Sequence, residues 1–171
     1  MFGKRTSVIL ALIFAIQILS GCSGQTANSN TASNQNESAA ASGPEKDGVK
    51  DNVSELGALI KFSLEPDDLA WKEFPAKDDQ RRRVLAVFQL TAEDSKKLVE
   101  RAAKIRPAKP VSITTEKWFP TELTTQSEMN RDEGIPAVSY AADEFYLEPF
   151  NEGTLSRVDN TDFFVLEVFA K

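Results

Sequence analysis

The sequence contains no histidine and only one cysteine among its 171 residues. Without an imidazole, a Ser-His-Asp triad, a Cys-His pair and a His-Glu-x-x-His zinc site are all excluded. A single cysteine also excludes an intrachain disulfide and every cysteine-cluster metal site. The net charge of −6 and the pI near 4.8 argue against nucleic-acid binding, which needs a basic surface. We therefore predict no nucleic-acid partner, no metal and no cofactor.

Other catalytic motifs are missing as well. No serine is followed three residues later by lysine, and no Gly-x-Gly-x-x-Gly or EF-hand loop occurs. Acid–base chemistry would then fall to carboxylates, of which Asp143, Glu144 and Glu148 form the best cluster. Paired carboxylates beside aromatic rings are what a glycosidase needs. In so acidic a domain we instead expect these carboxylates to point into solvent, while the neighbouring aromatic residues pack inward: Tyr140, Phe145, Tyr146 and Phe150.

The first 22 residues have the pattern of a secretory signal peptide. Lys4 and Arg5 form a short basic start, and residues 8–16 are an unbroken apolar run. This run is too short to span the roughly 30 Å hydrocarbon core of a bilayer comfortably. The alternative interpretation is an uncleaved N-terminal membrane helix.

The apolar region ends in Leu19-Ser20-Gly21-Cys22, which resembles the lipobox of bacterial lipoproteins. The resemblance covers residues 1–22 only. It implies diacylglycerol on the Cys22 sulfur, cleavage after Gly21 and an acyl chain such as palmitate on the new amino group. Two or more chains anchor a protein stably, whereas one holds it only marginally. Ser23 then implies the outer membrane in a Gram-negative host, while a Gram-positive host would keep the protein on the outer face of its cell membrane.

The remaining chain divides by composition at residue 50. Residues 23–50 are polar and almost without branched or aromatic apolar side chains, which predicts a disordered tether. Residues 51–171 are acidic, rich in aromatics and free of internal repeats, which predicts a single domain.

Two parts of this domain have clear patterns. Residues 83–90 are rich in strand formers, Thr91 is a suitable N-cap, and residues 92–105 repeat at helical spacing up to Pro107. At the C-terminal end, strands at 153–158 and 163–169 flank a turn at 159–162. The last strand is apolar on both faces except at Glu167, so we predict that it is central and covered on both sides.

Elsewhere the pattern is weaker. Residues 110–114 favour a strand, and residues 54–64 fit either a helix or a strand. Short helices are predicted near 120–129 and 141–146, with a polar loop over 126–134 between them. The predicted fold is α+β, a small antiparallel or mixed sheet of four to five strands with one main helix packed on it.

The expected function is non-enzymatic. A core of this size uses large aromatic side chains to fill itself, so core or core-rim packing is the favoured role of each tryptophan. The alternative is a binding surface, for which the candidates are Trp118, Phe119, Tyr140 and Tyr146, with residues 118–120 the most exposed. Residues 81–83, three arginines, fit an anionic lipid head group, although a solvated strand entry explains them better. We predict a lipid-anchored cell-envelope protein whose domain binds an envelope protein or glycan, and an accessory subunit of an envelope complex fits equally well. The alternative is a carboxylate-dependent envelope enzyme acting on polysaccharide.

Overall fold

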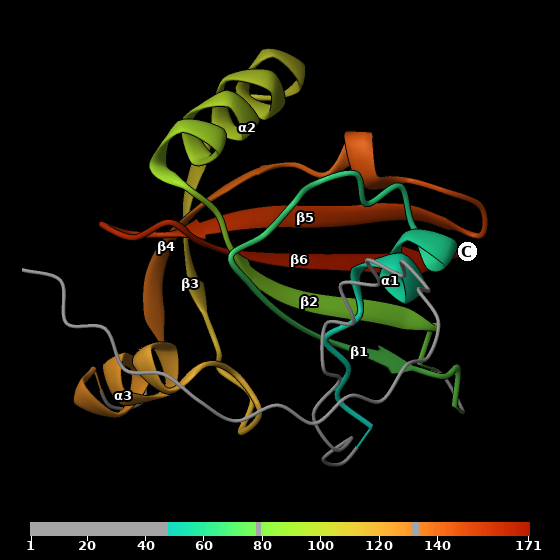
Figure 1. Cartoon of the computed structure of the whole chain (residues 1–171), viewed down its shortest axis with the longest axis horizontal. Coiled ribbons are helices and arrows are strands. Elements are labelled where there is room, and N and C mark those ends of the chain that lie inside the picture. Colours follow the sequence, from blue (N-terminus) through green and yellow to red (C-terminus); the bar gives the residue numbers. More distant parts are fainter. Residues whose placement is uncertain (1–47, 78–79, 131–133) are drawn as a thin grey trace, which may run out of the picture. The chain divides into compact units, whose positions relative to one another are not determined.

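A computed structural model describes residues 48–77, 80–130 and 134–171. These residues form one antiparallel sheet of six strands with three α-helices, which confirms the predicted α+β class (Figure 1). The predicted number of four to five strands is wrong, because six strands pair in the sheet. Cys22, the predicted signal peptide and tether residues 23–47 lie outside the described residues.

The strand order is β1-β2-β6-β5-β4-β3. β6 therefore lies inside the sheet between β2 and β5, as its apolar sequence predicted, and β1 and β3 are the edges. The hairpin of β5 and β6 and the strand before the main helix lie where the sequence placed them. The strands are β1 (Asp68–Phe74), β2 (Arg83–Gln89), β3 (Lys109–Ile113), β4 (Ile135–Ala141), β5 (Phe150–Val158) and β6 (Phe163–Ala170).

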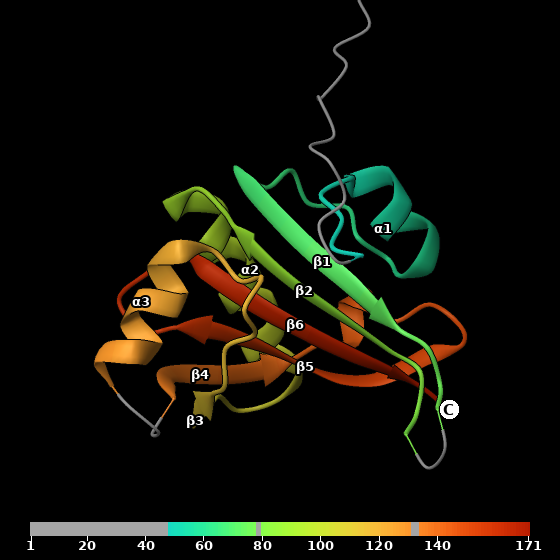
Figure 2. The same ribbon diagram turned by 90° about the horizontal axis from the view of Figure 1, so that it is seen from below.

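The helices lie on both sides of the sheet (Figures 1 and 2). Side chains of α1 and α2 pack into one apolar cluster, and Leu123 of α3 packs into another. The helices are α1 (Val53–Leu59), α2 (Ala92–Ile105) and α3 (Thr121–Met129), with a short 3-10 turn, η2 (Asp143–Phe145).

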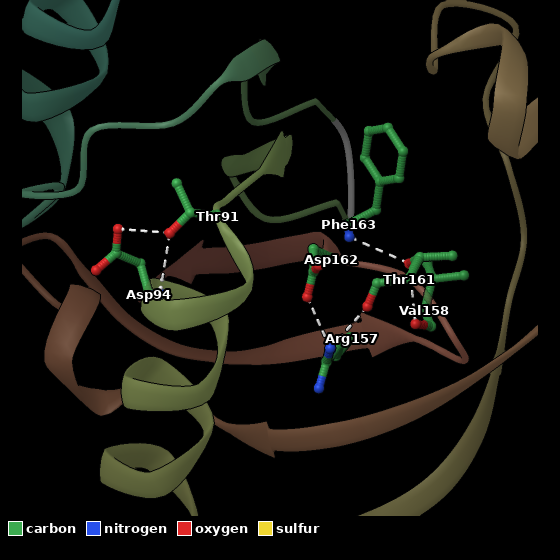
Figure 3. Close-up of polar contacts among 7 residues, drawn as sticks. All are labelled: Thr91, Asp94, Arg157, Val158, Thr161, Asp162 and Phe163. Carbon is green, nitrogen blue, oxygen red and sulfur yellow. Dashed lines mark hydrogen bonds and ion pairs between the residues drawn. The ribbon is translucent and has the colours of Figure 1, made fainter. Parts of the chain in front are cut away.

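The helix α2 has the bounds that the sequence predicted. The Thr91 hydroxyl accepts a hydrogen bond from the backbone N–H of Asp94 at 3.2 Å, which satisfies a donor of the first turn (Figure 3). Ser95, Leu98 and Ala102 face the sheet and are fully buried. Spacing of three and four residues places them on one side of the helix.

The turn between β5 and β6 is fixed by polar contacts, as its composition suggested (Figure 3). Arg157 donates through Nε to the Thr161 carbonyl at 2.8 Å and through a terminal nitrogen to the Asp162 carboxylate at 2.7 Å. Asn160 has a φ of 58°, a left-handed conformation that asparagine tolerates better than most residues. The turn sets the register that brings Leu155 opposite Leu166.

Two strands and one helix differ from the sequence prediction. β1 and β4 were not predicted. β1 pairs with β2 along seven residues, and β4 pairs with β5 along five. The helix expected over residues 141–146 is only the turn η2, because Ala141 ends β4. Of the ambiguous residues 54–64, the first part is helical, in α1.

The described chain enters the fold at the outer edge of β1. Lys50, which the composition assigned to the tether, forms two backbone hydrogen bonds of 2.8 Å with Trp71. The Trp71 indole donates to the Asn52 carbonyl at 3.2 Å and is 1% exposed. Lys50 therefore already belongs to the packed structure.

Candidate functional site

The two faces of the sheet are covered to different extents. Against one face, α1, α2 and the chain around η2 build a continuous apolar cluster, hereafter the closed face. The other face, hereafter the open face, is partly covered by α3 and by the segment that precedes it, residues 114–120 (Figure 2). We call residues 114–120 the strap, because they leave the edge strand β3 and cross the sheet in front of β6 (Figure 2).

Beside the strap the open face holds a cavity of about 400 Å³, hereafter the sheet groove. Four of the strands that build it, β2, β6, β5 and β4, are consecutive in the sheet. Side chains at alternate positions of these strands point into it, as strand geometry requires. The groove is lined by Arg83, Leu85, Val111, Ser112, Ile113, Thr114, Glu116, Phe119, Ser139, Thr154, Ser156, Val165 and Glu167.

Arg83 connects the sheet to the strap. One terminal nitrogen lies 2.5 Å from a carboxylate oxygen of Glu167 in β6, and the other lies 3.8 Å from Glu116 in the strap. The guanidinium also stacks on the Phe74 ring, 4.2 Å from its centroid. Since β2 and β3 are separated by three strands in the sheet, the contact with Glu116 shows that the strap crosses from one side to the other.

Hydroxyl groups continue the polar side of the groove. Ser139 of β4 stands directly opposite Ser156 of β5, and Thr154 stands opposite Glu167. Thr154 is exposed, Ser139 is half-buried and Ser156 is buried. A hydroxyl can both donate and accept a hydrogen bond, so this row adapts to either kind of ligand group.

The apolar floor of the groove is already packed. Leu85, Val165 and Phe119 are 6%, 7% and 5% exposed, and all three belong to the cluster beneath α3 and the strap. Apolar surface that a ligand could cover remains on the β3 side of the groove, where Val111 is 38% exposed and Ile113 is half-buried.

The four aromatic candidates do not form one surface. Trp118 and Phe119 lie on the open face with their rings 4.8 Å apart, whereas Tyr140 and Tyr146 pack against the cluster of the closed face. Phe119 is buried and Trp118 half-buried, so the expected exposure of residues 118–120 is not seen at Phe119. Burial raises the pKa of Tyr146, whose hydroxyl donates to the Gly153 carbonyl at 3.3 Å.

The three carboxylate candidates lie at the surface. Asp143 and Glu148 are exposed, and the partly exposed Glu144 accepts two hydrogen bonds from Arg101 at 2.9 and 3.2 Å. Hydrogen bonding with Glu144 raises the pKa of Arg101. Glu144 is the sole carboxylate among the residues that line a second hollow of about 400 Å³: Lys61, Ser63, Leu64, Arg101, Glu144 and Phe145.

The arginine triplet is bound into the domain. Each guanidinium stacks on a ring, Arg81 on Phe169, Arg82 on Phe150 and Arg83 on Phe74, at 4.9, 4.9 and 4.2 Å from the ring centres. Each also pairs with a carboxylate, and the partners are Glu152, Glu73 and Glu167. The hydrogen bond from Arg81 lowers the pKa of Glu152. Because each cation already has an anionic partner, the triplet offers little unpaired charge to a lipid head group.

Sequence reasoning named Phe119, which lines the groove, as a candidate for a binding surface and Arg83 as one of three arginines that fit a lipid head group, but it connected neither of them with Glu167. Glu167 interrupts the apolar pattern of β6, and Arg83 follows two other arginines. The signal that would have linked them is the strand order, because β2 and β6 are neighbours that place Arg83 and Glu167 on one face. Glu116 and the hydroxyl row carried no signal in the sequence.

Comparisons with known proteins do not assign this site. No protein-family model, no curated protein and no solved structure shows a significant match to the chain. Within residues 48–77, 80–130 and 134–171, no three acidic or cysteine side chains are grouped as a metal site would require. In the same part of the chain, no helix has the length and hydropathy needed to cross a bilayer.

Proposed function

We propose that this protein is a lipid-anchored cell-envelope protein whose folded domain is a non-enzymatic binding module, with the sheet groove as its ligand site. The observation that carries this proposal is the polar groove in the middle of a sheet whose central strand is otherwise apolar. A charged residue such as Glu167 is a poor choice for stability at that position. Local choices that contradict the fold are expected at functional sites.

The anchor part of the proposal rests on residues 19–22. Replacing Cys22 with serine removes the sulfur that would carry the lipid, so the Cys22→Ser variant should remain an unmodified precursor. Mass spectrometry of the wild-type protein should find lipid on Cys22. An unmodified Cys22 in the mature wild-type protein would contradict the anchor without touching the groove.

The groove part is tested by filling the cavity. Thr154 is exposed and lines the groove, so Thr154→Trp should block it, whereas Lys96→Trp places the same side chain on the exposed side of α2. Wild-type and Lys96→Trp protein should retain the same envelope component in a pulldown from membranes, and Thr154→Trp should lose it. Equal retention by all three proteins would place the binding site elsewhere.

The second candidate is a carboxylate-dependent enzyme acting on polysaccharide. It is favoured by one observation, that Glu116 and Glu167 line the same groove and both lie within 3.8 Å of Arg83. Binding remains the better proposal because Arg83 lies between the carboxylates, where a hydrolase needs room for substrate and water. Release of reducing ends from envelope polysaccharide, lost in Glu167→Gln, would favour the enzyme.

A further inference from the structure

We infer that the sheet groove binds an uncharged, hydroxyl-rich ligand, a short stretch of glycan, which bridges Arg83 on the sheet and Glu116 on the strap. This inference rests on the proposed function, since it names the ligand class of the same groove. Four features of the described residues lead to it.

The first feature is the apolar floor. Leu85, Val165 and Phe119 are each no more than 7% exposed before any ligand binds. Hydrophobic affinity grows with the apolar area removed from water, so an apolar ligand would gain little over this floor, and the exposed apolar side chain of the groove is Val111, on the β3 side. Away from β3, a ligand therefore binds mainly through hydrogen bonds.

The second feature is the charge of the groove. Arg83 already has Glu167 at 2.5 Å, so an anionic ligand finds no unpaired cation there. A cationic ligand would approach the same carboxylates at the cost of lying beside Arg83. An uncharged ligand is repelled neither by the carboxylates nor by the Arg83 guanidinium, and these charged side chains still form strong hydrogen bonds with it.

The third feature is the gap between Arg83 and Glu116. A terminal nitrogen of Arg83 and a carboxylate oxygen of Glu116 are 3.8 Å apart, beyond hydrogen-bond distance. A single hydroxyl can close this gap, because it accepts from the guanidinium and donates to the carboxylate. Thr154 and Ser139 offer further hydroxyls along the same wall, which suits a ligand with several such groups.

The fourth feature disfavours a peptide, the other ligand class with alternating donors and acceptors. An extended peptide is usually recognised by pairing with a free sheet edge. The groove lies on the face of strands whose backbones are paired with each other. The nearest edge, β3, contains Pro110, which has no N–H to donate, and an exposed Lys109, and both features are typical of edges that avoid pairing.

The test uses the full-length protein in a detergent without a sugar head group. Neutral trisaccharides of glucose and of N-acetylglucosamine are titrated by calorimetry, beside a tripeptide blocked at both ends. We expect at least one trisaccharide to bind and the tripeptide not to bind. Glu116→Ala removes a charged acceptor whose side chain is 43% exposed, and it should weaken binding about tenfold.

Three variants complete the test. Glu116→Gln keeps an acceptor oxygen and should fall between wild type and Glu116→Ala, Thr154→Trp should abolish binding, and Lys96→Ala should not change it. Circular dichroism establishes that each variant is folded.

The possible failures are distinguishable. If no trisaccharide binds but an envelope component still depends on Thr154, the glycan inference is wrong and the proposed function stands. If the tripeptide binds in a manner that Thr154→Trp abolishes, the ligand class is peptide and the inference is overturned. If nothing that binds depends on the groove, both proposals fall.

Discussion

On β6, consecutive side chains meet two different environments. Phe164, Leu166 and Val168 enter the closed face and are fully buried, whereas Phe163 and Val165 on the open face each retain 7% exposure and are followed there by Glu167. The same strand thus supplies a completed core on one side and an incomplete one on the other. The cover differs, because α1, α2 and η2 close one face while α3 and a single strap cross the other.

In this domain the side chains that stabilise the fold and those proposed to bind a ligand lie on opposite faces of the sheet. The closed face contains the large fully buried rings, such as Trp71 and Phe88. The open face contains the groove with its ion pairs and hydroxyls. Changes to the closed face should therefore affect unfolding, and changes to the groove should affect binding.

The largest expected difference is between two leucines. Leu166→Ala on the closed face leaves an enclosed void and should lower the free energy of unfolding by about 3–5 kcal/mol. Leu85→Ala on the open face leaves a space that joins the groove, where solvent can enter, and should cost about 2 kcal/mol. Urea denaturation of both variants measures the difference. Equal losses would mean that the open face is packed as tightly as the closed one.

The next effect concerns the helix that covers the closed face. Thr91→Ala removes the N-cap of α2 and should lower the free energy of unfolding by about 1 kcal/mol, while Thr91→Ser keeps the hydroxyl and should lose less. The Thr91 hydroxyl also donates to Asp94 and holds the pKa of that carboxyl below its usual value.

A lowered folded pKa stabilises the protein above the unfolded value near 3.8 and loses that effect as the pH falls through the folded pKa. Thr91→Ala should therefore raise the pKa of Asp94, as an NMR titration would show. An unchanged titration of Asp94 would mean that the hydroxyl does not bind the carboxylate in solution.

Ser95 offers a change in the opposite direction. Its hydroxyl lies on the buried side of α2 and has no hydrogen-bond partner among the described residues. Ser95→Ala removes an unsatisfied polar group and should raise the free energy of unfolding by about 1 kcal/mol in thermal or urea denaturation. A loss of stability would reveal a partner for this hydroxyl, such as a buried water.

The smallest effect on stability should come from the groove itself. Glu167→Gln weakens an ion pair whose two side chains are 30–31% exposed, and Arg83 keeps Glu116 nearby. The free energy of unfolding should change by less than about 1 kcal/mol, because such pairs contribute little. A large loss in urea denaturation would assign Glu167 to the stability of the open face rather than to binding.

The sequence was sufficient for elements with a strong local pattern. Residues 92–105 have a cap, an apolar stripe and a proline stop, and α2 has those bounds. β4 was missed because Gly134, just before its first residue, and Pro136, its second residue, are typical of turns. β1 was missed because Glu73 and Phe74 break its alternation, although Leu69 and Trp71 face the closed side.

The candidate site could not be predicted from local sequence patterns, for a different reason. Arg83, Glu116 and Glu167 are far apart in sequence and meet only because β2 and β6 are neighbours and the strap crosses the sheet. No window of the chain contains this geometry. The packing of the aromatic residues, in contrast, was predicted, since Phe145 and Phe150 point inward as expected and are 1% and 0% exposed.

The bridge between Lys50 and Trp71 also has a mechanical consequence. Any pull transmitted along the chain from before Gly48 reaches the domain at the outermost strand, where two hydrogen bonds are the first to bear load. Force from the N-terminal side is therefore met at the periphery of the sheet, and it must pass β1 and β2 before it strains β6.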